Sequence, residues 1–203
     1  SMVSKAPRNV KKSLQITGRN GIIQQCLKNA CAAGGHPLNK QLGIAFMFSG
    51  RNFEAPELVG ADISALRETA RVARGDVLKM TTLATCGHPG GSMSSMEMYL
   101  LLWSCANVNP KDPWMQGRDR IVVSHGHTSP GVYAVLGRCG FFPVEQAVAH
   151  FRQMSSAFAG HVERCAPGVE WDSGNLGQGL SAAVGFALAG RVKKQPYRVF
   201  CLM

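Results

Sequence analysis

The stretch Asp119-Arg120-Ile121-Val122-Val123-Ser124-His125-Gly126-His127 decides the fold class of this 203-residue chain. Its β-branched centre predicts a short buried strand, and its polar end predicts a loop at the carboxyl end of that strand. In an open parallel sheet, loops at this end line the ligand crevice. His125 and His127 are therefore candidate site residues from their position alone.

The segments that follow predict alternating helices and strands. A helix is expected from Ser129, as N-cap, to Gly140, and a helix rich in small residues from about 180 to 192. A last strand is expected over Arg198–Met203. Strands that alternate with helices predict the α/β class, here a partial doubly wound parallel sheet with flanking helices.

Elsewhere in the chain, the pattern of polar and apolar residues predicts three further helices and a loop. Apolar residues over Ile63–Met80 recur every three or four positions, which predicts one buried helix face. The glycines of Cys86–Ser92 predict a loop, and Ser94 with Glu97 fits a capping box for the next helix. Another helix is expected to begin at Pro143 and to end near Phe151.

The amino-terminal region differs from the rest of the chain. Glycines interrupt its candidate helices, and only Ile22–Ala33 has a passable helical pattern. We therefore divide the chain into residues 1–57, an extension of uncertain structure, and residues 58–203, which carry the ordered domain.

Composition narrows the class of protein. The chain has no run of about 18 apolar residues that could span a bilayer. Its seven cysteines form no Cys-x-x-Cys pair, so free thiols in a reducing cytoplasm are expected. The net charge of +10 admits nucleic-acid binding, but no nucleic-acid module is present, and a basic solvated surface explains the charge better.

The glycine-rich turn Gly174–Gly179 is the second candidate binding element. Free backbone N–H groups at the start of the following helix attract phosphate or diphosphate groups, and glycines allow close approach. The spacing matches neither the dinucleotide-binding fingerprint nor the P-loop. The histidines and this turn are each weak signals when taken singly.

Four sequence blocks, taken together and in order, resemble the transketolase family. They are Gly87–Ser92, Asp119–Ala134, Gly160–Glu163 and Pro167–Ser181. The resemblance covers about residues 58–203. Gly87-His88-Pro89-Gly90 argues against the deoxyxylulose-phosphate synthase branch, which tends to have leucine in place of Pro89, and a stand-alone amino-terminal transketolase subunit fits better.

The resemblance implies a thiamine-diphosphate-binding fold and a transferase activity in carbohydrate metabolism. The two-carbon ketol unit would move between sugar phosphates, with thiamine diphosphate as the cofactor. By resemblance, His88 and His161 would contact the substrate and His127 the diphosphate. The remaining cofactor contacts would come from Gly174, Asn175 and Leu176.

Three residues depart from the family pattern. His125 stands where lysine or asparagine is usual, Val162 stands where proline is common, and Asn175 stands where many relatives carry proline or serine. These differences would tune substrate choice or mark a divergent subgroup.

The resemblance also implies partners. In the family, the strand that matches Arg198–Met203 runs into a Gly-Asp-Gly motif that binds Mg²⁺, so the metal ligands are expected beyond Met203. A catalytic glutamate belongs to another domain, so a carboxy-terminal subunit or domain and a homo- or hetero-oligomer are expected. The chain by itself would then be inactive; the alternative is a non-catalytic binding protein on the same truncated fold.

Overall fold

The computed structural model describes residues 51–54 and 57–203. The helix predicted over residues 22–33, and nearly all of the predicted extension, lie outside the described residues. The described elements, in chain order, are η1 (Arg51–Phe53), α2 (Gly60–Leu83), α3 (Pro89–Ser94), α4 (Met96–Cys105), β1 (Arg120–Val123), η2 (Gly126–Thr128), α5 (Ser129–Arg138), α6 (Val144–His150), α7 (Gln178–Val192) and β2 (Val199–Leu202).

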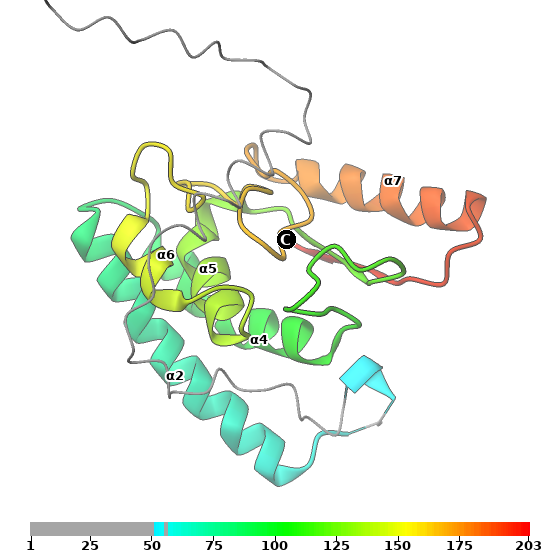
Figure 1. Cartoon of the computed structure of the whole chain (residues 1–203), viewed down its shortest axis with the longest axis horizontal. Helices are drawn as coiled ribbons and strands as arrows, with labels where there is room; N and C mark the ends of the chain where they lie inside the picture. The colour runs from blue at the N-terminus through cyan, green and yellow to red at the C-terminus, as the bar shows by residue number, and fades with distance from the viewer. Residues whose placement is uncertain (1–50, 55–56) are drawn as a thin grey trace, which may run out of the picture.

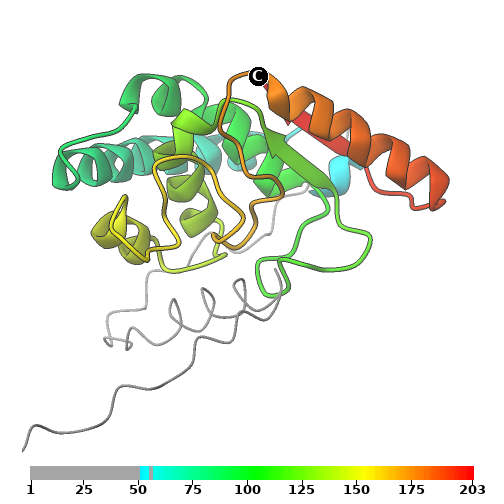
Figure 2. The same cartoon turned by 90° about the horizontal axis from the view of Figure 1, so that it is seen from above.

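The two strands of the described region, β1 and β2, form a small parallel sheet. Val122 lies opposite Cys201 and Val123 opposite Leu202. The side chains alternate between the two faces, so Ile121 and Val123 join the main hydrophobic core while α7 packs against the strands. Figures 1 and 2 show α7 on one side of the strands and the other helices on the opposite side. The predicted α/β class is present in this helix-rich form.

Helices α2, α4 and α5 build the hydrophobic core. Ala73, Val77 and Met80 of α2 have no exposed surface, as their helical spacing predicts. Ile63, predicted on the same face, is 39% exposed because it lies in the first turn of α2, at the margin of the core. Within residues 51–54 and 57–203, no helix has the length and apolar character needed to cross a bilayer.

Two predicted helix starts are wrong. The expected loop at 86–92 contains the first turn of α3, which Pro89 opens. Ser94 belongs to α3 and donates its hydroxyl to the Gly91 carbonyl 3.1 Å away, so it caps no following helix. Ser129 donates to the Gly160 carbonyl at 2.8 Å instead of capping α5. In both cases the serine hydroxyl donates to a nearby carbonyl and does not cap a helix.

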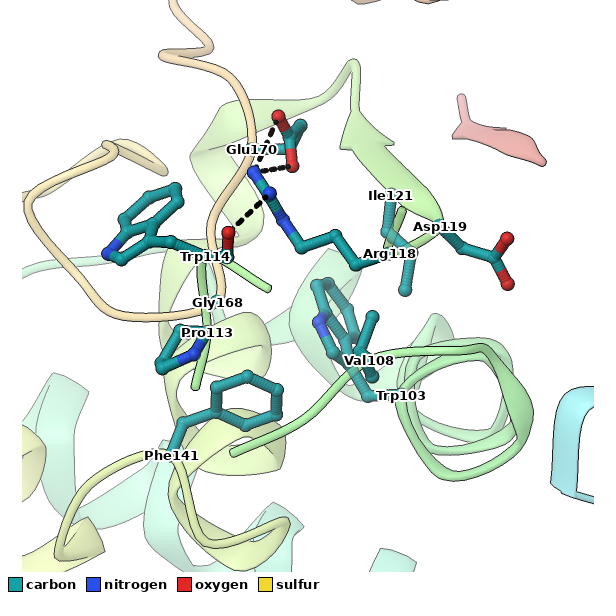
Figure 3. Close-up of a pocket in the computed structure, with 10 residues that line it drawn as sticks. All are labelled: Trp103, Val108, Pro113, Trp114, Arg118, Asp119, Ile121, Phe141, Gly168 and Glu170. Atoms are coloured by element: carbon teal, nitrogen blue, oxygen red, sulfur yellow. Dashed lines mark hydrogen bonds and ion pairs between the residues drawn. The ribbon is translucent and has the colours of Figure 1, made fainter. Parts of the chain in front are cut away.

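Buried ion pairs hold the amino-terminal end of the sheet. The Glu170 carboxylate lies 2.9 Å from Arg118 Nη2 and 3.1 Å from Arg120 Nη1. Figure 3 shows the Arg118 side chain reaching Glu170, while the Asp119 carboxylate points to the other side. Asp119 binds Arg198, the residue before β2, with an Nη2–Oδ2 distance of 2.6 Å. These pairs tie β2 and the segment before the glycine-rich turn to the start of β1.

Replacing Glu170 with glutamine is expected to lower the free energy of unfolding by about 3–5 kcal/mol, because the buried guanidinium of Arg118 and the partly buried one of Arg120 lose their counter-ion. Urea unfolding monitored by circular dichroism measures the change. Glu68→Gln is the matched control, since Glu68 pairs with Arg71 on the exposed surface of α2 and should leave stability unchanged. Equal effects of the two substitutions would contradict the assignment.

Glycines let α7 approach β1 closely. A Cβ on Gly179 would lie 2.6 Å from the Ser124 Cα, so alanine there should destabilise the chain by about 1–3 kcal/mol. A Cβ on Gly185, in the same helix, meets no atom within 4 Å, and Gly185→Ala should stabilise it by about 0.5–1 kcal/mol. Thermal unfolding of the two variants should show midpoint shifts of opposite sign.

Candidate functional site

Three histidines from separate loops converge beyond the carboxyl end of β1. His88 precedes α3, His127 lies in η2, and His161 lies between α6 and α7. The ring centroids are 5.0 Å apart for His88 and His127 and 4.5 Å apart for His127 and His161, and both pairs meet edge to face. The structure thus brings together the three histidines that the sequence predicts for the site, with His127 in the middle.

Backbone hydrogen bonds hold the loops that carry the outer histidines. The Val162 amide donates to the Gly126 carbonyl at 3.0 Å, which ties the His161 loop to η2. The buried hydroxyl of Tyr133 in α5 donates to the His161 carbonyl at 2.8 Å. On the other side, the Ser92 hydroxyl donates to the His88 carbonyl at 2.9 Å. These bonds act on the backbone of the histidine loops and use none of the three imidazole rings.

The glycine-rich turn is locked onto the same end of β1. A Cβ on Gly126 would lie 2.3 Å from the Ser173 carbonyl oxygen, so only glycine fits there. The Ser173 hydroxyl donates to the Val123 carbonyl, and the Gly177 amide donates to the Ser124 carbonyl at 3.3 Å. Between these two anchors the three predicted cofactor contacts, Gly174, Asn175 and Leu176, are exposed.

Electrostatics favour an anion at the histidine cluster. Burial lowers the pKa of His161 below its ordinary value, and the nearby His127, Arg152 and His88 lower it further. His127 Nδ1 is buried and has no hydrogen-bond partner among the described residues. Because a buried polar atom without a partner is unfavourable, a ligand that bonds to this nitrogen would complete the site. Imidazole donors and accessible backbone groups suit a diphosphate.

His125, which topology alone placed in the crevice, is half-buried and bonds to protein groups through both ring nitrogens. Its Nε2 lies 2.8 Å from the Tyr99 hydroxyl, and its Nδ1 lies 3.1 Å from the Leu202 carbonyl. Since a carbonyl only accepts, Nδ1 carries the proton and the neutral Nε2 accepts from Tyr99. His125 therefore links the end of β2 to α4.

Arg152 is a residue that the sequence did not single out. A Cβ on Gly160 would lie 2.8 Å from the Arg152 guanidinium carbon, and the positive charge of Arg152 lowers the pKa of His161. Arg152 follows the end of α6 with a positive φ of 60°. No motif marks this position, so only the folded path of the loop places its charge beside the cluster.

Acidification is expected to destabilise the chain partly through His125. Burial lowers the pKa of His125 below its ordinary value of 6.5, so the unfolded chain binds more protons than the folded one as pH falls below 6.5. The free energy of unfolding should then decrease with falling pH. The pKa of His161 is also lowered, so its titration changes the free energy of unfolding in the same direction.

The check is urea unfolding of the parent chain and of His125→Gln between pH 8 and pH 5. The variant should show a shallower loss of stability on acidification, because glutamine does not titrate. The values at pH 8, where the histidine is neutral, are the reference for both proteins. Parallel pH profiles would show that His125 is not responsible.

Comparisons with known proteins identify relatives of this chain. Residues 65–199 match the family model of the transketolase thiamine diphosphate binding domain. Transketolase from Pongo abelii is 36% identical over 143 residues, which are 70% of this chain and 23% of that protein. Transketolase from Treponema pallidum is 40% identical over 127 residues, 62% of this chain and 19% of that protein.

Solved structures show the same likeness in three dimensions. The transketolase of Campylobacter jejuni superposes with a TM-score of 0.61 and 34% identity, covering 67% of this chain and 23% of that one. The transketolase of Leishmania mexicana gives a TM-score of 0.60 and 32% identity, covering 67% and 22%. Fold and site define a thiamine-diphosphate-binding domain of the α/β class. The chain belongs to the transketolase family, and it spans less than a quarter of the length of the relatives just described.

Proposed function

We propose that this chain forms the amino-terminal, cofactor-facing part of a transketolase that transfers a two-carbon ketol unit between sugar phosphates. The observation that carries the proposal is the row of His88, His127 and His161, with the buried, unpartnered Nδ1 of His127 at its centre. Transketolase from Pichia stipitis has been solved in complex with sedoheptulose 7-phosphate, which supports sugar phosphates as the substrate class.

Each histidine has a proposed role that its surroundings support. His127 is half-buried beside the glycine-rich turn and would donate to the diphosphate. His88 is exposed and His161 half-buried on either side of it, where both can reach a sugar phosphate. The lowered pKa of His161 keeps its imidazole neutral near pH 7, so it can accept a proton from a substrate hydroxyl. Bound thiamine diphosphate supplies the carbanion that carries the ketol unit.

The exposed turn completes the proposed cofactor contacts. Gly174, Asn175 and Leu176 would lie along the cofactor, and Gly177 begins α7 with a left-handed φ of 86°. For Mg²⁺ we propose ligands in the chain that continues from β2, because β2 ends beside His125 at the same edge of the sheet as the histidine loops. The metal would neutralise the diphosphate charge opposite His127.

The exposed face of α7 supports the proposal of a partner domain or subunit. Leu180, Val184, Leu188 and Val192 recur every four residues and are 45%, 52%, 54% and 82% exposed. A helix that is apolar on both faces is normally buried on both. We propose that the carboxy-terminal part of the enzyme, or a second subunit, covers this stripe.

The test is calorimetric titration of thiamine diphosphate with Mg²⁺ into the chain alone, and into the full amino-terminal domain, extended past β2, assembled with a carboxy-terminal transketolase partner. The chain alone should bind weakly or not at all, and assembly should restore binding and ketol transfer. In the assembly, His127→Ala should weaken binding roughly 10- to 100-fold, because one hydrogen bond to a charged group is lost.

His150→Ala is the matched control, since His150 is exposed at the end of α6, bonds to Gln153 in the following loop and lies outside the cluster. Unchanged affinity in His127→Ala, with His150→Ala also unchanged, would contradict the proposed cofactor contact. An assembly that binds the cofactor but transfers no ketol unit would favour a non-catalytic role.

A further inference from the structure

A second cavity lies at the amino-terminal end of the sheet, opposite to the histidine cluster. Its volume is about 390 Å³, which falls within the range of about 300–1,000 Å³ typical of small-molecule sites. The walls come from the start of β1, from α7 and from the loop between α7 and β2. The lining residues used below are Arg120, Glu170, Phe186, Lys193, Gln195 and Tyr197.

The cavity carries an excess of positive charge. Glu170 is the acidic residue of the lining, and it already accepts hydrogen bonds from two guanidinium groups. One is that of Arg118, drawn in Figure 3, and the other is that of Arg120. Arg120 uses Nη1 for this contact, while its buried Nε has no partner among the described residues. Lys193 is exposed and takes part in no ion pair within the described part of the chain. Two cationic groups, from Arg120 and Lys193, therefore face a single carboxylate that is already satisfied.

One wall of the cavity is aromatic and fixed. The Arg120 guanidinium carbon lies 4.8 Å from the centre of the Tyr197 ring, and the Tyr197 hydroxyl donates to the Phe186 carbonyl at 2.8 Å. The Phe186 ring in turn meets Trp171 edge to face, with centroids 6.3 Å apart. These contacts hold a flat apolar surface beside the cationic groups.

The loop that carries Lys193 and Gln195 is also held in place. The Lys193 amide donates to the Ala189 carbonyl at 2.9 Å, and the Gln195 amide donates to the Gly190 carbonyl at 2.9 Å. These bonds continue from the last turn of α7, so the lysine and the amide of Gln195 are presented from a short, anchored turn. A preorganised loop loses less entropy when a ligand binds.

We propose that this cavity binds a small aromatic anion, a planar ring that carries a phosphate or a carboxylate. The anionic group would lie between Arg120 and Lys193, where charge-assisted hydrogen bonds are strongest, and the ring would lie against Phe186 and Tyr197. The site is separate from the histidine cluster, because β1 alone puts about 10 Å between its two ends. Its occupation does not depend on thiamine diphosphate.

The test titrates the purified chain with phenyl phosphate, benzoate, inorganic phosphate and phenol, followed by ¹H–¹⁵N NMR. Comparing phenyl phosphate with benzoate shows whether the site prefers a phosphate or a carboxylate. Inorganic phosphate tests the anionic group without the ring, and phenol tests the ring without the anionic group. Phenyl phosphate or benzoate should bind more tightly than either half and should shift the amide signals of Phe186, Lys193 and Tyr197. Shifts confined to other regions, or binding of neither aromatic anion, would overturn the proposal.

Matched lysine variants separate a specific contact from general attraction. Lys193→Gln should weaken binding of the aromatic anion about tenfold, equivalent to about 1.4 kcal/mol. Lys194→Gln should have no effect, because Lys194 is the next residue and does not line the cavity. Equal weakening by both variants would show that only surface charge attracts the anion. Loss of binding in His127→Ala would place the anion at the histidine cluster and overturn this site without affecting the proposed function.

Discussion

The close contact between Gly126 and Ser173 is the constraint on which the histidine site depends. No side chain can stand at position 126, because its Cβ would overlap the Ser173 carbonyl. Ser173 and Gly177 then donate to the last residues of β1 and the loop beyond it, and Val162 donates to Gly126 itself. The loop after β1 and two parts of the long connection between α6 and α7 are thereby fixed at one strand end.

Different interactions hold the segments together at the two ends of the sheet. At the carboxyl end, hydrogen bonds to backbone groups and glycine contacts bring the loops together, and His127 Nδ1 is left without a hydrogen-bond partner among the described residues. At the amino-terminal end, Glu170 and Asp119 are buried and paired with arginines from neighbouring segments. Buried ion pairs are costly to break, so this end keeps β1, β2 and the Glu170 segment in register while the opposite end remains available to ligands.

Much of the ordered fold was predictable because its elements follow strong local patterns. The β-branched run at 121–123 and the helical spacing from 63 to 80 correspond to β1 and to the inner face of α2. The helix starts at Ser94 and Ser129 were not predicted correctly, because each serine hydroxyl has a carbonyl acceptor that the sequence pattern does not reveal.

By itself, the sequence determined the order of helices and strands, the family to which the chain belongs, and the three histidines that meet at the site. Only the tertiary structure decided that His125 links β2 to α4, since its partners Tyr99 and Leu202 lie 26 and 77 residues away along the chain. It also decided that Arg152 stands beside His161. The reason is physical: local patterns report which face of an element is buried, whereas a polar side chain's partner depends on how distant segments pack.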